Sequence, residues 1–240
     1  MDIWVLDLTS GIETRLTFGA YSATDPTWSP DGRQVAFAAT ESGKRSIRRK
    51  PIGGGPEETL IDLNEQIFPQ DWLPDGSLVC LSLRGKTFYR LAPGDKKLQP
   101  LIESPFEKDE PHVSPDGKWI AYDSNESGRW EVYVAGFPSF TDKRQVSGTG
   151  GGQPLWRKDG KEIYYLTLAG AMVVVDVKNG AGVLEIGPPR TLFQTRLDVA
   201  PTYDQYRVSA DGQRFLILDA VGEGAQEFTV VLNATAGLRR

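Results

Sequence analysis

The chain has 240 residues, of which 39% are hydrophobic and 10% aromatic, a composition that excludes a disordered polypeptide. Its 27 basic and 32 acidic residues give a formal charge of -5, so nothing in its electrostatics favours nucleic acid or an anionic membrane as a partner. The single cysteine, Cys80, excludes an internal disulfide framework and, in an apolar run, is expected to be inert. All-β chains of this length commonly form one domain, and we predict a single domain over residues 1–240.

The first predicted strands lie at Ile3–Asp7 and Thr14–Thr17. They have the character of the last two strands of a partial repeat over residues 1–18. Because the first two strands of that repeat are missing, we expect an N-terminally truncated part of a larger parent. The N-terminus has no basic region followed by a long apolar one, and no segment reaches the about 18 apolar residues of a membrane span. We therefore expect neither an export signal nor membrane insertion by this chain.

A short segment ending in Asp-Gly then recurs five times, with glycines 44, 41, 43 and 52 residues apart. In three of the five, proline precedes the aspartate and sets the backbone angle of a turn, while the Asp side chain caps the turn and Gly adopts positive φ. We predict five hairpin turns, in which the Asp-Gly pairs have a structural role. The pairs are Asp31 and Gly32, Asp75 and Gly76, Asp116 and Gly117, Asp159 and Gly160, and Asp211 and Gly212.

Large apolar residues flank each turn at fixed distances. Four residues before the glycines lie Trp28, Trp72, Val113, Trp156 and Val208. Three and five residues after them lie Val35 and Phe37, Val79 and Leu81, Ile120 and Tyr122, Ile163 and Tyr165, and Phe215 and Ile217. A spacing of two places residues on one face of a strand, so we predict that this set forms the core. The tryptophans are expected to pack as wedges between neighbouring repeats.

Each hairpin is followed by a third strand and usually a fourth. Third strands are predicted at residues 45–50, 87–91, 130–135, 171–175 and 228–232, and fourth strands at 58–61 and 143–146. Four strands in a repeat of about 40 to 50 residues are typical of a β-propeller. We therefore predict an all-β propeller of four-stranded antiparallel blades, with five hairpin-bearing blades, a partial N-terminal blade and a six-bladed parent. The predicted blades span residues 22–64, 65–104, 106–148, 150–195 and 202–235.

Two of the repeats carry a resemblance to a known family. Trp-Ser-Pro-Asp-Gly followed by Arg-Gln-Val-Ala-Phe, and Val-Ser-Pro-Asp-Gly followed by Lys-Trp-Ile-Ala-Tyr, resemble the TolB-like, WD-like propeller repeat. Residues 228–238 are similar to the end of the propeller regions of bacterial serine/threonine protein kinases. The resemblance implies a sensing or protein-binding propeller that is periplasmic or extracytoplasmic in its parent. The fifth repeat departs from the pattern, with Tyr206, Val208 and Ala210 in place of Pro, Trp and Pro.

Catalytic and cofactor motifs are scarce in the sequence. A Gly-x-Ser-x-Gly elbow is absent, and His112, the single histidine, is assigned a structural or surface role. One histidine and one cysteine cannot form a zinc or iron shell, and no Asp-rich calcium loop occurs. The glycine runs at 53–55 and 148–152 precede predicted strands rather than helices, so they are connections and not phosphate cradles. We expect no metal, no cofactor and no enzymatic activity.

A polar residue stands at the start of each innermost strand and is a candidate for binding at the rim of a central channel. These residues are Asp25, Gln70, Glu110, Gln153 and Gln205. The expected partner is a protein or a small-molecule ligand, and simple solvation of a loop is an equally good interpretation. The alternative function is that of the propeller domain of a prolyl-oligopeptidase-like peptidase, or a carboxylate-dependent glycoside hydrolase.

Overall fold

A computed structural model describes residues 1–83, 86–180, 183–220 and 226–232. All regular structure among these residues is β-strand, and every paired strand is antiparallel to its neighbour. The predicted all-β class is therefore confirmed. No helix in this part of the chain is long and apolar enough to cross a membrane. The chain divides into two compact units, Met1–Pro105 and Phe106–Arg240, and the single-domain assignment stays a prediction.

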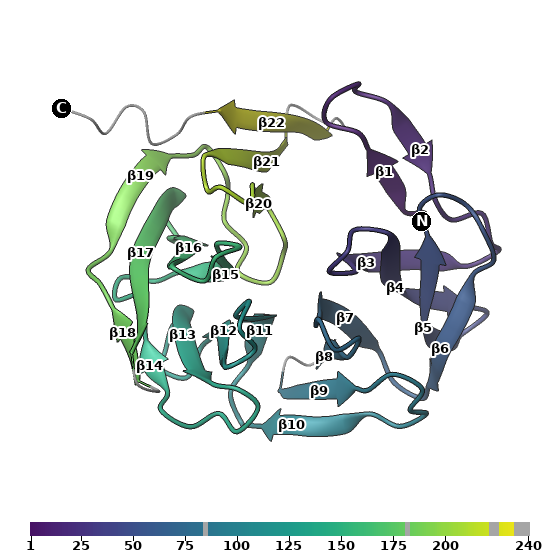
Figure 1. Cartoon of the computed structure of the whole chain (residues 1–240), viewed down its shortest axis with the longest axis horizontal. Coiled ribbons are helices and arrows are strands. Elements are labelled where there is room, and N and C mark those ends of the chain that lie inside the picture. Colours follow the sequence, from purple (N-terminus) through teal and green to yellow (C-terminus); the bar gives the residue numbers. More distant parts are fainter. Residues whose placement is uncertain (84–85, 181–182, 221–225, 233–240) are drawn as a thin grey trace. The chain divides into compact units, whose positions relative to one another are not determined.

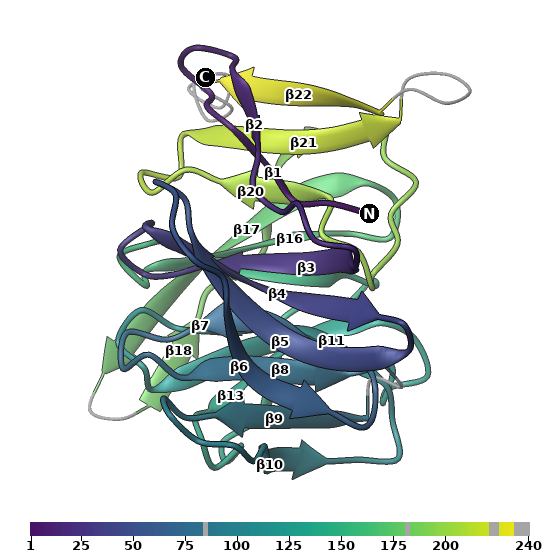
Figure 2. The ribbon, with the colours of Figure 1, turned by 90° about the vertical axis from the view of Figure 1, so that its right-hand side faces the viewer.

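Unit 1 begins with a two-stranded sheet and continues with two four-stranded sheets (Figures 1 and 2). Each strand pairs with its neighbour along the chain, so each four-stranded sheet is an up-and-down meander with its first strand at one edge. The strands are β1 (Trp4–Leu6), β2 (Glu13–Arg15), β3 (Ser22–Trp28), β4 (Gln34–Glu41), β5 (Lys44–Pro51), β6 (Glu58–Leu63), β7 (Ile67–Trp72), β8 (Leu78–Ser82), β9 (Thr87–Leu91) and β10 (Gln99–Glu103).

Unit 2 contains a four-stranded, a five-stranded and a three-stranded sheet. The strands are β11 (Lys108–Val113), β12 (Trp119–Ser124), β13 (Glu131–Gly136), β14 (Arg144–Gln145), β15 (Gly152–Trp156), β16 (Glu162–Leu166), β17 (Ala171–Gly180), β18 (Val183–Ile186), β19 (Arg190–Gln194), β20 (Tyr206–Val208), β21 (Arg214–Ala220) and β22 (Gln226–Leu232). The long strand β17 pairs with β19 through its first half and with β18 through its second half. Of the last predicted blade, residues 221–225 and 233–235 lie outside the described residues.

The five Asp-Gly pairs connect the first two strands of each hairpin-bearing sheet by the same local geometry. Every glycine of the set has φ between 69° and 85°, a region in which a side chain is strained. Each Asp Oδ1 accepts the backbone N–H of the residue after the glycine, at 2.9 to 3.2 Å. The glycine N–H in turn donates to the carbonyl three residues before it. Local chemistry therefore closes each hairpin without help from distant residues.

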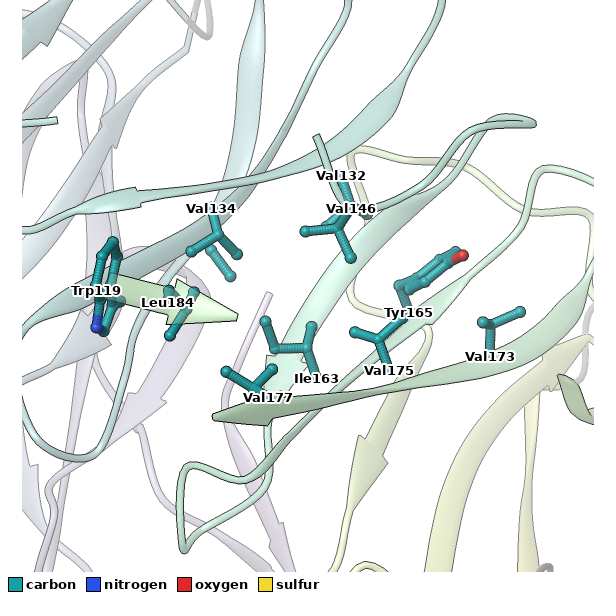
Figure 3. Close-up of a cluster of buried hydrophobic side chains, with 11 residues drawn as sticks. Trp119, Val132, Val134, Val146, Ile163, Tyr165, Val173, Val175, Val177 and Leu184 are labelled. Atoms are coloured by element: carbon teal, nitrogen blue, oxygen red, sulfur yellow. The ribbon is translucent and has the colours of Figure 1, made fainter. Parts of the chain in front are cut away.

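The alternating apolar residues after each turn are buried, and none of the ten is more than 5% exposed. Figure 3 shows one of the resulting clusters, in which Val134 from β13, Ile163 from β16 and Leu184 from β18 converge between neighbouring sheets. The core of unit 2 is thus built between consecutive sheets, and each sheet buries one face against the next. Burial of this kind contributes about 25 cal/mol per Å² of apolar surface.

The tryptophan wedges behave as predicted in two of three cases. Trp72 is buried in a cluster that includes Ala36 and Ile47 of the preceding sheet, and Trp156 donates its Nε1–H to the backbone carbonyl of His112, at 3.0 Å. The core prediction is wrong for Trp28, which is 47% exposed. The sheet before it, β1–β2, has two strands only, whereas Trp72 and Trp156 each follow a four-stranded sheet.

Candidate functional site

Four of the five candidate rim residues occupy a β-bulge in the first strand of their sheet. The pairing register shifts across Asp25 in β3, Gln70 in β7, Glu110 in β11 and Gln153 in β15. Asp25, Glu110 and Gln153 each precede a proline and have φ of 52°, 46° and 59°. Left-handed backbone in non-glycine residues is costly, and bulges often re-aim a side chain. Gln205 lies immediately before β20.

The structure brings together the three candidates of unit 2. In unit 1, Asp25 is exposed and Gln70 is half-buried, as expected from solvation of a loop. In unit 2, Gln153 and Glu110 are 2% and 4% exposed, so solvation does not explain them. Both buried rim candidates therefore belong to unit 2.

Gln153 and Gln205 bind each other reciprocally. The Nε2–H of Gln153 donates to Oε1 of Gln205 at 2.9 Å, and the backbone N–H of Gln205 donates to Oε1 of Gln153 at 2.8 Å. The Tyr206 hydroxyl donates to the backbone carbonyl of Gln153, at 2.8 Å, and Nε2 of Gln205 donates to the carbonyl of Asp198, at 2.9 Å. These bonds fasten the segment that leads into β20 to strand β15, so both glutamines position the loop that carries Asp204.

Beside this loop lies a group of four charged or titratable side chains, which we call the β11–β20 cluster. Glu110 and His112 come from β11, Asp204 comes from the loop before β20, and Arg207 comes from β20. The Nε2 atom of His112 is 3.7 Å from Oε2 of Glu110. One side-chain ligand atom from each of Glu110, His112 and Asp204 lies within 4.8 Å of the other two. Arg207 donates to both carboxylate oxygens of Asp204.

The two carboxyl groups of the β11–β20 cluster have opposite electrostatic environments. Burial raises the pKa of Glu110 well above its usual range, and the charge of Asp204 and the hydrogen bond to it act in the same direction. Desolvation also acts to raise the pKa of Asp204, but the Arg207 guanidinium outweighs it and holds that pKa below the usual range. The hydrogen bond between the two carboxyl groups needs one proton, and these opposite pKa shifts favour Glu110 as its holder. The cluster combines two carboxyl groups of opposite pKa shift with an imidazole and a guanidinium.

Accessibility differs across the β11–β20 cluster. The side chains of Asp204 and Arg207 are 43% and 46% exposed, whereas that of Glu110 is buried. Oε2 of Glu110 has no hydrogen-bond partner among the described residues. Buried oxygens are rarely left in this state, because an unsatisfied buried polar group costs about 1 to 3 kcal/mol. The cluster therefore has a solvent-facing ion pair above a buried, unsatisfied acceptor.

A second buried acid supports this region. Asp123 of β12 is fully buried, and its Oδ2 accepts the backbone N–H of Gln153 at 3.0 Å. Burial raises its pKa well above the usual range, and the charge of Asp109 adds to the effect. A Cβ at Gly152 would lie 2.6 Å from Oδ2 of Asp123. A glycine is therefore required for the close approach of β15 to this carboxyl group.

The sequence reasoning found part of this site. It selected Glu110, but it assigned His112 to a structural or surface role, and it did not select Asp204, Arg207 or Asp123. The spacing of Glu110 and His112, two residues apart on one predicted strand, was a usable signal for a shared face. Asp204 reaches Glu110 across 94 residues of chain (204 minus 110), and no local pattern marks it.

The chain is similar to several bacterial proteins, although no protein-family model matches it. It is 30% identical over 139 residues to protein Atu1656 of Agrobacterium fabrum, covering 50% of this chain and 46% of that protein. It is 26% identical over 164 residues to the peptidase YuxL of Bacillus subtilis, covering 52% of this chain and 25% of that protein. The chain thus spans half or less of the length of these relatives.

Solved structures similar to this chain are TolB-like β-propellers. TolB from Acinetobacter baumannii matches with a TM-score of 0.72 and 17% identity, over 96% of this chain and 57% of TolB. An oligogalacturonate lyase in complex with manganese matches with a TM-score of 0.68 and 12% identity, over 97% of this chain and 71% of the lyase. A puromycin-hydrolysing peptidase of Mycobacterium tuberculosis matches with a TM-score of 0.59 and 16% identity, over 90% and 44%. The predicted propeller fold is confirmed.

These matches contradict our expectation that the protein is not an enzyme. One sequence relative is named a peptidase, and the similar structures include a lyase and a peptidase. The expectation was based on the absence of a serine-protease motif, but one fold supports many chemistries. The missing motif concerned one reaction type within these 240 residues and gave no information on other kinds of catalysis.

Proposed function

We propose that this chain is the ligand-binding propeller of an enzyme, and that the β11–β20 cluster binds a peptide ligand of that enzyme. The observation that carries the proposal is the buried Oε2 of Glu110, which has no hydrogen-bond partner among the described residues and lies beneath the exposed pair of Asp204 and Arg207. The Asp204 carboxylate and the Arg207 guanidinium are thus open to solvent. The buried Oε2 of Glu110 is an acceptor that a ligand could satisfy.

The chemistry of the β11–β20 cluster fits a ligand with both kinds of charge. Glu110 and Asp204 accept hydrogen bonds from an amine, and Arg207 presents planar donors that match a carboxylate. A short peptide carries a positively charged amine and a negatively charged carboxylate a few Å from each other. The charged groups of an acidic sugar are all carboxylates, so it has no positive charge to offer Glu110 and Asp204. The similarity to a peptidase over about half of this chain supports the same ligand class.

Calorimetric titration of the whole chain with di- and tripeptides, in buffer containing EDTA, tests the proposal. We expect binding that weakens at least about 10-fold in Glu110→Gln and in Arg207→Gln. Glu185→Gln, which changes an exposed carboxylate of β18, is the matched control and should bind as the unaltered chain does. Oligogalacturonates are titrated in parallel. Binding of these sugars without peptides, or peptide binding that all three variants retain, would contradict the proposal.

Three finer proposals come from the sequence resemblance. They are a sensor role, a parent that is a receptor-like serine/threonine kinase, and a periplasmic or extracytoplasmic location. None of the relatives described above is a kinase, so the second proposal depends on residues 228–238, of which 233–238 lie outside the described residues. The coding sequence upstream of Met1 tests it directly, since a kinase domain there would support it and a different enzyme domain would refute it.

A further inference from the structure

We propose that Glu110, His112 and Asp204 bind a divalent transition-metal ion of the zinc and manganese class. The inference uses the same β11–β20 cluster as the proposed function, but it concerns the metal alone and is tested without any peptide. It also revises our expectation from the sequence that the chain has no metal site. That expectation considered histidine with cysteine and clustered aspartates, and not one histidine with two carboxylates from separate segments.

The geometry of the three side chains permits a shared ion. Their ligand atoms lie within 4.8 Å of one another, and Nε2 of His112 is 3.7 Å from Oε2 of Glu110. Metal–ligand bonds of about 2.1 Å place neighbouring ligand atoms about 3 to 3.5 Å apart in a tetrahedral shell. The nearest pair is already close to that separation. Asp204 is an exposed side chain paired with the exposed Arg207, so a small shift of this pair would close the remaining distance.

An independent observation indicates that the group lacks a partner. Oε2 of Glu110, on a side chain that is 5% exposed, has no hydrogen-bond partner among the described residues, and the same atom is the one nearest to His112. A metal ion between Glu110 and His112 would satisfy it. The bulge at Glu110, with φ of 46°, turns this side chain at the cost of local strain, which is the behaviour expected of a residue positioned for binding.

The donor set selects the class of ion. One imidazole and two carboxylates suit zinc, manganese, iron(II) and cobalt, whereas magnesium and calcium prefer oxygen ligands alone. Three protein ligands leave at least one position for water or a substrate atom. Arg207 is a positioning residue here. It contacts both oxygens of Asp204, and each of these oxygens has a second lone pair available for the ion.

The strand that carries two of the three ligands is also fixed from behind. The indole Nε1–H of Trp156 donates to the backbone carbonyl of His112 at 3.0 Å. Gln153 and Gln205 hold the loop that carries Asp204 through their reciprocal bonds. Preorganised ligands lose little conformational entropy on binding, so this support favours a defined site over diffuse attraction of cations.

The test is calorimetric titration of the EDTA-treated, dialysed whole chain with chlorides of zinc, manganese, magnesium and calcium. We expect one equivalent of zinc or manganese to bind, and magnesium and calcium to bind at least about 10-fold more weakly. The matched variants are His112→Gln and Asp204→Asn, with Glu185→Gln as the control. Each ligand variant should weaken binding at least about 10-fold, and the control should not. Because Asp204 is exposed, its variant has little reason to misfold.

Cobalt(II) gives a second, spectroscopic measurement. One equivalent should produce visible absorption bands of an ordered nitrogen- and oxygen-ligated site, and these bands should be lost in His112→Gln. Three results would overturn the inference. They are the absence of one-equivalent binding, an affinity in both ligand variants equal to that of the unaltered chain, and a loss of affinity in Glu185→Gln as large as that in the ligand variants. Metal binding without peptide binding would refute the proposed function alone. Peptide binding in EDTA without any metal binding would refute this inference alone.

Discussion

Gln153 and Gln205 hold each other by two hydrogen bonds although 52 residues separate them in the chain. The bonds use the side chain of each residue, and the backbone of Gln205 as well. They join strand β15 to the loop before β20, and with it the residue Asp204. A stable position for the candidate site therefore depends on an amide pair that is not itself among the three candidate metal ligands.

Replacement of Gln153 by Ala should release this loop. The substitution leaves the half-buried N–H of Gln205 without its acceptor and removes the Gln153 donor to Oε1 of Gln205, and we expect a loss of about 1 to 3 kcal/mol in the free energy of unfolding. Hydrogen exchange should increase for residues 198–206. Gln99→Ala, in exposed β10, serves as the control. Unchanged exchange in this loop would show that the glutamine pair does not hold it.

Replacement of Asp123 by Asn should change how stability depends on pH. The pKa of Asp123 is raised above the ordinary value of 3.8 by burial, so between that value and its folded pKa the folded chain holds a proton that the unfolded chain has lost. Its contribution is therefore most favourable below pH 3.8 and is lost as the pH rises through the folded pKa. Asn does not ionise. We expect the stability of Asp123→Asn relative to the unaltered chain to increase from pH 4 to pH 8 in chemical denaturation.

The matched control for this pH profile is Asp62→Asn, which changes an exposed carboxylate of β6. Its stability relative to the unaltered chain should stay nearly constant over the same range. Parallel profiles for Asp123→Asn and the unaltered chain would mean that Asp123 does not bind a proton differently in the two states.

Replacement of Ile163 by Ala should destabilise the chain strongly. Ile163 is fully buried at the junction of two sheets, beside Val134 and Val177 (Figure 3). Removal of three carbon atoms leaves a cavity, for which we expect a loss of about 2 to 5 kcal/mol in the free energy of unfolding. Val183→Ala, on the neighbouring strand β18 and 50% exposed, should cost well under 1 kcal/mol. Equal losses at the two positions would argue against the packing described for this junction.

Replacement of Gly117 by Ala tests the backbone of the hairpin turn in isolation. Gly117 has φ of 71°, and no heavy atom lies within 4 Å of the position of an added Cβ. Any loss of stability therefore comes from the backbone angle, and we expect about 1 to 2 kcal/mol. Gly148→Ala has the same open space without positive φ and should be close to neutral. Thermal or chemical unfolding of both variants makes the comparison, and a neutral Gly117→Ala would refute the role of the angle.

The sequence predicted the fold well, because the fold is specified locally. The turn at Asp116 and Gly117 depends on residues within the same few positions, and the alternation of Ile120 and Tyr122 marks the buried face of β12. Trp28 was mispredicted because its exposure depends on a neighbouring sheet that has two strands. Local pattern does not report how many strands a neighbour supplies.

The candidate site was only partly predictable for the same physical reason. Glu110 was selected because it repeats the position of Asp25 and Gln153, but Asp204 and Arg207 belong to a loop and strand that meet β11 through tertiary structure. His112 looked like an isolated histidine because Asp204, which lies near it in space, is far from it in the chain. The enzyme question was misjudged because it was decided from the absence of one motif.

The bulge before proline in β3, β11 and β15 separates the side chain that a sheet presents from the residues that fold the sheet. The bulged residue is held by backbone geometry and not by its own side chain, since Asp25, Glu110 and Gln153 adopt the same left-handed φ with three different side chains. The hairpin and the apolar face of each sheet are specified by other positions. In each of these three strands, a substitution at the bulged position can therefore change the chemistry without changing the fold. One codon decides whether the sheet presents a carboxylate, an amide or another polar group.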